Sequence, residues 1–429
     1  MKIFEWPRQK SDVTEFFGQV AETPADIEKA VDAIIADVRK GGDKAVSRLM
    51  EKFDRVRIEP GRFDVPKEKL AEAWAAAPKG LKHALKTAKK RIEAFHKKQR
   101  LAGWVMNDPA FGRIEQRVLA LSRVAVYVPA GKAPLVSTVL MNVIPAQVAG
   151  VEEIILVTPP GPDGWPNPGI LAAAHLVGVD RVLRVGGSPA MPALAYGTET
   201  IPRVDKVVGP GNIFVTTAKK RLYGRFDIES TAGPSEVLIL ADETANLEYI
   251  AADMLAQAEH DGNNPAGAVL IGGGKRRAAA LAKEIARQCA LLSRSDLAAS
   301  SLDRWGYIIS ARTAEQALEL ADMKAPEHLE IVTKTARQMA GKVRHAGAVF
   351  VGPWTPEPVG DYIAGPNHTL PTGGTARFFS PLSVWSFYRT SHTVEASRKG
   401  LMSLANDIVT LAESEQLTAH AQSVKVRTK

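Results

Sequence analysis

The stretch RVAVYVPAGKAPLVSTVLMNVIPAQVAGVEEIILVTPP, residues 123–160, contains the repeating unit from which the fold can be deduced. It begins and ends with short, β-rich apolar runs, residues 123–129 and 153–160, and a helical pattern around residues 137–149 lies between them. A strand, a helix and a second strand in this order are typical of a βαβ unit, in which the two strands are parallel.

Strand-like runs and helical patterns continue to alternate beyond this stretch, in two series. The first series adds residues 181–187 and 205–212, each followed by a helical pattern. The second begins at EVLIL, residues 236–240, and continues through AVLIGG, GYIIS, LEIV and GAVFVG to near Gly352. Strands that alternate with helices indicate a parallel sheet covered on both faces. The sequence therefore predicts an α/β fold with two tandem Rossmann-like, doubly wound units.

The rest of the chain is arranged around these two units. We predict an N-terminal arm at 1–22, a helical part at 23–122 that packs on the second α/β domain, a first α/β domain at 123–234, a second at 235–374, and a C-terminal tail at 375–429. A chain of 429 residues, 45% of them apolar, is long enough to form two or three domains.

The chain is basic, with a net charge of +8 and a pI near 9.4, so a nucleic-acid-binding protein is one alternative. Much of the charge lies in KGLKHALKTAKKRIEAFHKKQR, residues 79–100. As a helix, this segment has lysines on one face and an apolar stripe on the other, formed by Leu81, Leu85, Ala88, Ile92 and Phe95. Such a helix is typical of a solvated face packed on the protein body. The sequence contains no nucleic-acid recognition motif, and we expect no nucleic-acid partner.

Cysteine content and hydropathy indicate the compartment. The single cysteine, Cys289, excludes an internal disulfide and a cysteine-rich metal site, and a reducing compartment fits. The longest uncharged run, residues 133–151, contains prolines and several polar residues, which makes it a poor candidate for a membrane span. We expect a soluble, cytoplasmic protein without a membrane partner.

Two polar side chains lie near the end of a predicted helix, residues 246–260. Its apolar residues form one stripe at helical spacing. Gln257 and His260 are three residues apart and therefore share a face that lies off this stripe. Taken alone, the histidine is equally consistent with an interaction with the helix dipole.

Two further segments carry side chains of the same chemical kind. The Gly- and Pro-rich segment 352–374 follows a predicted strand and carries Asp361 and His368, which we expect near the carboxyl ends of the strands, where open α/β sheets bind ligands. The tail carries Glu415 and His420. An amide oxygen, a carboxylate and two imidazoles would suit zinc or another borderline divalent ion. Their spacing along the chain is not a known metal signature.

The stretch KAPEHLEIV, residues 324–332, places a carboxylate, Glu327, directly beside an imidazole, His328. These residues fit either a loop that leads into a buried strand or an acid–base pair held at the entrance of that strand. For a nucleotide, the sequence has neither a G-x-G-x-x-G nor a P-loop motif. It has small residues at strand ends, in VYVPAGKAP, VGGSPA and VGPGN, which permit close approach of a ligand but also fit tight βα turns.

Several motifs in fixed order resemble the histidinol dehydrogenase family. They are YVPAGKAPLVSTVLMNVIPA, ALAYGTETIPRVDKVVGPGN, AGPSEVLIL, AADMLAQAEHD, APEHLEI, TPEPVGDYIAGPNHTLPTGGTARF and LAESEQLTAHAQSV, and the resemblance extends from about Asp37 to Val424. It implies an aldehyde-dehydrogenase-like architecture. It also implies oxidation of L-histidinol to L-histidine with two NAD⁺ and one bound zinc per subunit.

The resemblance also implies a role for individual residues. The zinc ligands would be Gln257, His260, Asp361 and His420. The substrate contacts would be Ser235, His328, His368 and Glu415, together with the metal ligands. Glu327 and His328 would be the acid–base pair, and Tyr127, Pro189 and Asn212 match positions on the NAD⁺ side. The family is a homodimer whose C-terminal tail enters the partner's site, so His420 and Glu415 would serve the neighbouring subunit.

Two departures from the family pattern affect the cofactor side. Family members commonly have two glycines after the proline of the first motif, where this chain has Ala130 and Gly131. Members also commonly have glutamine after G-G-A, where this chain has Pro189, which has no amide side chain. An alternative within the superfamily is an NAD-dependent dehydrogenase of another small polar alcohol, such as a sulfonated diol. Cys289 lies in none of the motifs, which favours a hydrate route over a covalent thiol adduct.

Overall fold

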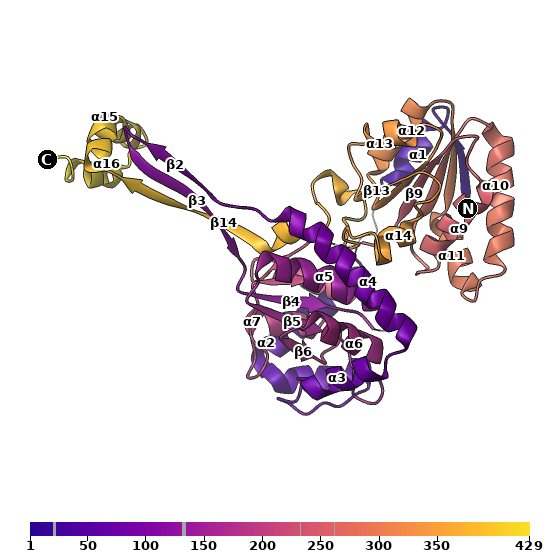
Figure 1. The fold of residues 1–429 in the computed structure, drawn as a ribbon, viewed down its shortest axis with the longest axis horizontal. Helices are drawn as coiled ribbons and strands as arrows, with labels where there is room; N and C mark the ends of the chain where they lie inside the picture. The colour runs from indigo at the N-terminus through magenta and orange to yellow at the C-terminus, as the bar shows by residue number, and fades with distance from the viewer. Residues whose placement is uncertain (20–22, 131–133, 232, 261) are drawn as a thin grey trace.

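The computed structural model describes residues 1–19, 23–130, 134–231, 233–260 and 262–429. It contains two α/β units that lie side by side and a long arm that projects away from them (Figure 1). The two tandem parallel-sheet units predicted from the sequence are confirmed.

The first unit contains a five-stranded parallel sheet with the order β6-β5-β4-β7-β8. Its strands are β4 (Arg123–Tyr127), β5 (Glu153–Val157), β6 (Arg181–Leu183), β7 (Lys206–Val208) and β8 (Asp227–Ile228). Its helices are α5 (Val136–Ala149), α6 (Pro168–Val177), α7 (Ala190–Tyr196) and α8 (Ile213–Leu222). The chain order reverses between β4 and β7, and the carboxyl ends of these two strands therefore flank the switch point of the sheet.

The second unit contains a six-stranded parallel sheet with the order β1-β11-β10-β9-β12-β13. Its strands are β1 (Lys2–Glu5), β9 (Val237–Ala241), β10 (Ala266–Ile271), β11 (Tyr307–Ala311), β12 (His328–Val332) and β13 (Ala348–Val351). Its helices are α1 (Lys10–Phe17), α9 (Leu247–Ala258), α10 (Gly274–Cys289), α11 (Ser295–Trp305), α12 (Ala314–Lys324), α13 (Ala336–Ala340) and α14 (Glu357–Tyr362). The two strands β9 and β10 are apolar without interruption because helices cover both faces. The start of the predicted N-terminal arm is thus the edge strand of this sheet, since β1 pairs with β11.

The helical part at 23–122 packs on the first unit, not on the second as we predicted. α2 (Ala25–Asp54) contacts α7 and α8, α3 (Lys67–Ala76) contacts α6, and α4 (Lys79–His96) contacts α5. The apolar stripe of the basic helix explains the last contact, because Leu85, Ala88 and Ile92 join the same core cluster as Leu140 of α5. As expected, most of the lysines of α4 lie on its exposed or half-exposed face.

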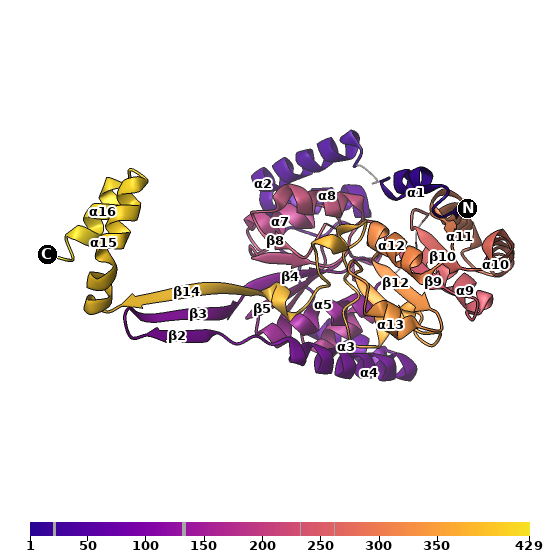
Figure 2. The ribbon, with the colours of Figure 1, turned by 90° about the horizontal axis from the view of Figure 1, so that it is seen from above.

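Residues 104–120, which the sequence interpretation left within the helical part, form two strands. β2 (Trp104–Asp108) and β3 (Gly112–Ala120) pair with each other, and β3 pairs antiparallel with β14 (Tyr388–Ala396) along its whole length. This ribbon projects from the first unit and ends in two helices, α15 (Arg398–Ser414) and α16 (Thr418–Lys425) (Figures 1 and 2). The main partner of β3 lies at the far end of the chain, so local sequence did not reveal it.

The arm exposes many large apolar side chains. They are Trp104, Val105, Met106, Val394, Met402, Leu404, Ile408, Leu411, Leu417 and Val426. Leu411 in α15 is 65% exposed and Trp104 in β2 is 50% exposed. So many exposed large apolar side chains on one projecting arm favour an interface with another molecule. None of the helices in the described part of the chain is long and apolar enough to cross a membrane.

Candidate active site

The polar side chains predicted for catalysis and metal binding gather at the amino-terminal edge of the second sheet. Ser235 lies just before β9, and His328 is the first residue of β12. Gln257 lies in the last turn of α9, the helix that returns from the carboxyl ends of the strands to this edge. Asp361 lies in α14, the helix that follows β13. We expected the segment 352–374 to act at the carboxyl ends of the strands. That prediction is wrong, because α14 carries Asp361 back to where β12 begins.

The turn Lys324–Glu327 determines how Glu327 and His328 enter the site. α12 ends at Lys324, and Ala325 has a left-handed backbone with φ of 49°. Pro326 cannot continue the helix. β12 then begins at His328, which pairs with Val237 of β9 and Ala348 of β13. The backbone N–H of His328 donates to the carbonyl oxygen of Glu236 at 3.2 Å.

The ring of His328 is buried and held in one orientation. Its Nδ1 lies 3.0 Å from the carbonyl oxygen of Glu236, an acceptor, so Nδ1 carries the proton in the neutral ring. Its Nε2 has no hydrogen-bond partner among the described residues and lies 3.6 Å from Asp361 Oδ1. In the neutral ring, the nitrogen that faces Asp361 therefore has a free lone pair, which is what a general base needs.

Three carboxylates surround this ring. Nδ1 of His328 lies 3.6 Å from Glu327 Oε2 and 3.7 Å from Glu357 Oε1, in addition to the Asp361 contact at Nε2. Burial opposes a charge on the imidazole, but the negative charges of the three carboxylates raise the pKa of His328 well above its ordinary value. A cation bound at Asp361 would offset part of this negative charge and lower that pKa.

Glu327 is a buried carboxyl group with two fixed donors. Its Oε2 accepts from Ser235 Oγ at 2.5 Å and from the backbone N–H of Glu236 at 2.9 Å. Burial raises the pKa of Glu327 to about 7, against the opposing effects of His328 and these hydrogen bonds. A carboxyl group that titrates near neutral pH can accept a proton under physiological conditions. The two readings of KAPEHLEIV are thus compatible, since the segment is both a strand entrance and a carboxyl–imidazole pair.

Glu357, which the sequence interpretation missed, fixes Gln257. With the amide of Gln257 oriented so that both ends face suitable partners, its Nε2 donates to the two carboxylate oxygens of Glu357 at 3.1 and 3.2 Å, and its Oε1 lies 3.1 Å from Ser235 Oγ. Glu357 is buried, and burial raises its pKa to about 8. Its spacing of four residues from Asp361 was the available sequence signal, because such residues share a helix face.

Asp361 stands at the centre of three imidazoles. Burial opposes its ionisation, but the close approach of His328 at 3.6 Å and the charges of His328, His368 and His260 hold the pKa of the carboxyl below its ordinary value. His260 lies just beyond α9, which ends at Ala258 and is shorter than we predicted. His368 is oriented by Nδ1, which lies 3.0 Å from the carbonyl oxygen of Asp361.

The donor set of this site fits a divalent metal. His328, Glu357 and Asp361 each place one ligand atom within 4.8 Å of the others. The predicted set shares only Asp361 with these three. Gln257 lies beside them through its hydrogen bonds to Glu357, and His260 is close enough for its charge to affect the pKa of Asp361. Imidazole, carboxylate and amide oxygen atoms are suitable ligands for zinc.

The tail residues lie far from this group within one chain. Glu415 and His420 are exposed, at and beyond the end of α15. α15 and α16 occupy the tip of the arm, at the opposite end of the molecule from α9 and α14 (Figure 1). A single copy of the chain therefore does not bring His420 to Asp361.

The residues predicted for NAD⁺ lie at the carboxyl edge of the first sheet. Tyr127 ends β4, Pro189 precedes α7 and Asn212 precedes α8. The hydroxyl of Tyr127 accepts from Gly187 N–H at 3.1 Å, and Asn212 Oδ1 accepts from Val215 N–H at 3.1 Å. Pro189 is buried. Gly131, which belongs to the first departure noted in the sequence, lies outside the described residues.

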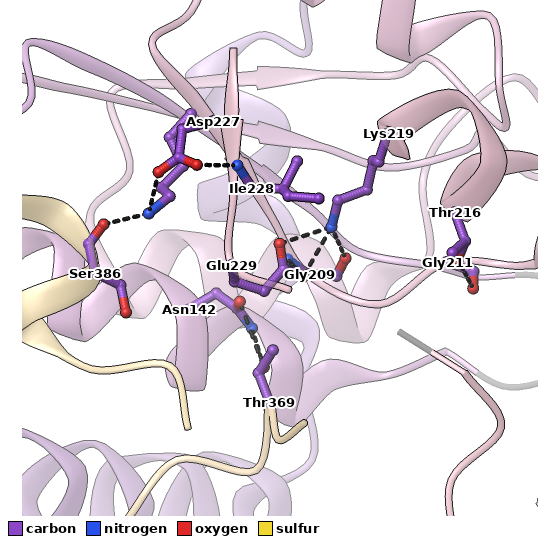
Figure 3. Close-up of polar contacts among 11 residues, drawn as sticks. Asn142, Gly209, Gly211, Thr216, Lys219, Asp227, Ile228, Glu229, Thr369 and Ser386 are labelled. Atoms are coloured by element: carbon purple, nitrogen blue, oxygen red, sulfur yellow. Dashed lines mark hydrogen bonds and ion pairs between the residues drawn. The ribbon is translucent and has the colours of Figure 1, made fainter. Parts of the chain in front are cut away.

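A buried ion pair supports the VGPGN turn on this edge. Lys219 Nζ lies 2.7 Å from both carboxylate oxygens of Glu229 and donates to the carbonyl oxygen of Gly209 at 3.1 Å (Figure 3). Glu229 also accepts from Gly209 N–H at 3.1 Å. Both charged side chains are about 5% exposed or less. Both backbone groups of Gly209 are thereby satisfied, and the turn before Asn212 is held in place.

Side-chain hydrogen bonds join the two units beside the site. Asn142 Nδ2 of α5 donates to Thr369 Oγ1 at 3.2 Å (Figure 3). Thr138 Oγ1 of α5 lies 3.3 Å from His368 Nε2. A cavity of about 450 Å³, a volume typical of small-molecule sites, adjoins Asp361 and His368 and is otherwise lined mainly by apolar residues. The candidate substrate side chains thus lie between the second sheet and a helix of the first unit.

Comparisons with known proteins agree with this geometry. The family model described as histidinol dehydrogenase matches residues 19–428. The histidinol dehydrogenase of Syntrophotalea carbinolica is 46% identical over 409 residues, 95% of this chain and 94% of that protein. That of Aquifex aeolicus is 46% identical over 410 residues, covering 96% and 94%. The crystal structure of histidinol dehydrogenase from Elizabethkingia anophelis superposes with a TM-score of 0.92 at 33% identity, covering 100% of this chain and 98% of that one.

Proposed function

The chain belongs to the histidinol dehydrogenase family, and from that premise we propose a zinc- and NAD-dependent oxidation of L-histidinol to L-histidine through L-histidinaldehyde. The protein is an oxidoreductase of histidine biosynthesis. The observation that carries the catalytic assignment is the fixed ring of His328, whose Nδ1 is bonded to a backbone carbonyl and whose Nε2 is free beside Asp361. We place this activity in the cytoplasm, where NAD-dependent biosynthesis of free amino acids takes place.

Two hydride transfers and one water addition complete the reaction. In the first step the carbinol carbon loses a hydride to NAD⁺ while Nε2 of His328 accepts the hydroxyl proton, and the products are the aldehyde and NADH. Water then adds to the aldehyde to form the hydrate, with Glu327 as the base. In the last step, after His328 has released the first proton to solvent, the hydrate loses a second hydride to a second NAD⁺ and becomes the carboxylic acid, which ionises to the carboxylate of histidine by losing a proton to water. His328 again takes the hydroxyl proton.

Gln257, His260 and Asp361 would hold the zinc together with a histidine of a second copy. A bound zinc would supply a fixed attachment point for the amino and imidazole nitrogens of the substrate. Ser235 supports this arrangement because its hydroxyl contacts both Gln257 and Glu327. Ser235 and His368 are the substrate contacts that one chain supplies near Asp361.

We also propose a homodimer in which each arm completes the partner's active site. Two observations support this arrangement. The arm presents a row of exposed apolar side chains, including Leu411 and Leu417 on either side of Glu415. The proposed ligand set from one chain is one amide, one imidazole and one carboxylate, while His420 lies exposed at the tip of the arm. Tyr127, Asn212 and the turn at Pro189 would contact NAD⁺ at the edge of the first sheet.

The overall proposal is tested by NADH formation from L-histidinol. We expect the zinc-loaded protein to form two NADH per histidinol consumed and to lose this activity when a chelator removes the metal. Re-addition of zinc should restore the rate. Absence of NADH formation by the zinc-loaded protein would refute the assignment. A parallel measurement with small sulfonated diols distinguishes the alternative substrate class.

Exchange of Glu327 for Gln should impair aldehyde oxidation more than alcohol oxidation. The amide keeps the hydrogen bonds to Ser235 and Glu236 but cannot accept a proton from water. With the wild type, the rate of aldehyde oxidation should increase as the pH rises through about 7, because burial raises the pKa of Glu327 to that value and the base must be ionised. Each half-reaction is measured separately by NADH absorbance. Equal losses in both half-reactions would argue against water activation by this residue.

A further inference from the structure

Glu330 is a buried carboxyl group that the proposed mechanism does not use. It lies in β12 two residues after His328, so both side chains point to the same face of the sheet. It is 1% exposed. Its Oε1 accepts the backbone N–H of Glu357 at 2.8 Å, at the first residue of α14. The N-cap residue Pro356 has no side-chain acceptor, so Glu330 caps this helix from a neighbouring strand.

The other carboxyl oxygen of Glu330 faces a second acid. Its Oε2 is buried and has no N–H or O–H donor in the described part of the chain. The carboxyl of Asp253 in α9 lies beside it, close enough for the two groups to form a hydrogen bond when one of them is protonated. Burial raises the pKa of both groups, that of Asp253 to about 6 and that of Glu330 well above its ordinary value. A single proton between the two carboxyl groups satisfies both oxygens.

These two hydrogen bonds connect the helices on either side of the candidate metal position. Asp253 lies four residues before Gln257 on the same face of α9. The other bond ends at Glu357, on the helix that carries Asp361. Glu330 is therefore bonded to both α9 and α14, the helices that carry Gln257 and Asp361.

We propose that Glu330 is a positioning residue that sets the distance between Gln257 and Asp361 through its hydrogen bonds to Asp253 and Glu357. The inference rests on the zinc site of the proposed function. Residues behind metal ligands commonly determine affinity, and their loss costs about 10–100-fold in metal binding. Glu330 has no contact with substrate or cofactor in this arrangement, so it acts through the ligands.

Zinc affinity of purified protein tests the proposal, measured by competition with a chromogenic chelator. Glu330→Leu keeps the approximate volume but leaves the N–H of Glu357 and the carboxyl of Asp253 without partners, and we expect zinc affinity to fall by about 10–100-fold. Glu330→Gln can still accept from Glu357 and donate to Asp253, and we expect its affinity to remain within about threefold of wild type. If the wild-type protein itself does not bind zinc, the proposed zinc site is refuted. That outcome differs from failure of this inference, in which the wild type binds zinc and Glu330→Leu binds it equally well.

Asp242→Leu is the matched control. The Asp242 carboxylate accepts from the backbone N–H of Lys334 at 2.7 Å and so bridges loops at the opposite edge of the same sheet. Its loss should lower stability and leave zinc affinity unchanged. Wild-type zinc affinity in folded Glu330→Leu overturns the proposal, as does a loss in Glu330→Gln equal to that in Glu330→Leu. If Glu330→Leu does not fold, Asp253→Leu replaces it, with Asp253→Asn as the conservative partner and the same expected outcomes.

A second measurement does not depend on the metal. Amide hydrogen exchange of a peptide covering α14 should be faster in metal-free Glu330→Leu than in metal-free wild type, because the N–H of Glu357 and the first turn of the helix lose their cap. Glu330→Gln should match the wild type. Unchanged exchange in Glu330→Leu contradicts the capping step on which the proposal depends.

Discussion

Asn in place of His328 is expected to reduce the rate of both oxidation steps by about 10²–10⁴, the usual range for loss of a general base. The amide of Asn can still donate to the carbonyl oxygen of Glu236, the role that Nδ1 has in the wild type. It places no proton acceptor at the position of Nε2. Because the same nitrogen takes the proton in both hydride transfers, the two half-reactions should lose similar factors.

The measurement is steady-state NADH formation with L-histidinol and, separately, with L-histidinaldehyde. His96→Asn is the matched control, because His96 in α4 is also buried, has Nδ1 2.8 Å from the carbonyl oxygen of Ile92, and has an unpartnered Nε2. We expect that variant to retain its activity. Near-normal turnover of either substrate by His328→Asn would remove this residue from the base role.

Two inactive variants should restore activity when their chains are mixed. Asp361→Ala removes the carboxylate at the centre of the site and should release the metal, and His420→Ala removes the ligand that we assign to the arm. Each variant alone should be almost inactive. In a mixed dimer, one of the two active sites combines an intact Asp361 from one chain with an intact His420 from the other. Random exchange makes about half of the dimers mixed, so about a quarter of wild-type activity should return.

Elemental analysis and activity after joint refolding of the two variants provide the measurement. Refolding Asp361→Ala with a variant that carries both Asp361→Ala and His420→Ala is the control, because no chain in that mixture has an intact Asp361. If the histidine acted within its own chain, every site in the mixture would lack one ligand and no activity would return. Full zinc occupancy in Asp361→Ala would remove that residue from the ligand set.

The sequence predicted the units of the fold because the period of its apolar residues changes where strands and helices alternate. The strands at residues 123–129 and 236–240 were found in this way. β2 and β3 were not, because most of the ladder that stabilises β3 comes from β14, far along the chain. The position of the helical part was also wrong, since an apolar stripe shows that a helix packs but not on which unit.

The site was only partly accessible from local patterns. The direct adjacency of Glu327 and His328 drew attention to this pair, and the family resemblance supplied the roles. The backbone carbonyl of Glu236 that fixes the His328 ring leaves no signal in a sequence. Glu330 was missed because an acid in an apolar strand has no distinguishing spacing. Glu357 was missed because its four-residue spacing from Asp361, the one signal available, does not by itself distinguish a site residue. Their function depends on burial and on donors from other elements.

The arm is a stiff strut whose length is fixed by a hydrogen-bonded ladder. Two of its strands, β3 and β14, lie in opposite halves of the gene and pair residue for residue from Gly112 with Ala396 to Ala120 with Tyr388. An insertion in one strand alone would shift every later pair and turn side chains to the other face. Lengthening or shortening of the strut during evolution therefore requires matched changes at two distant places in the coding sequence.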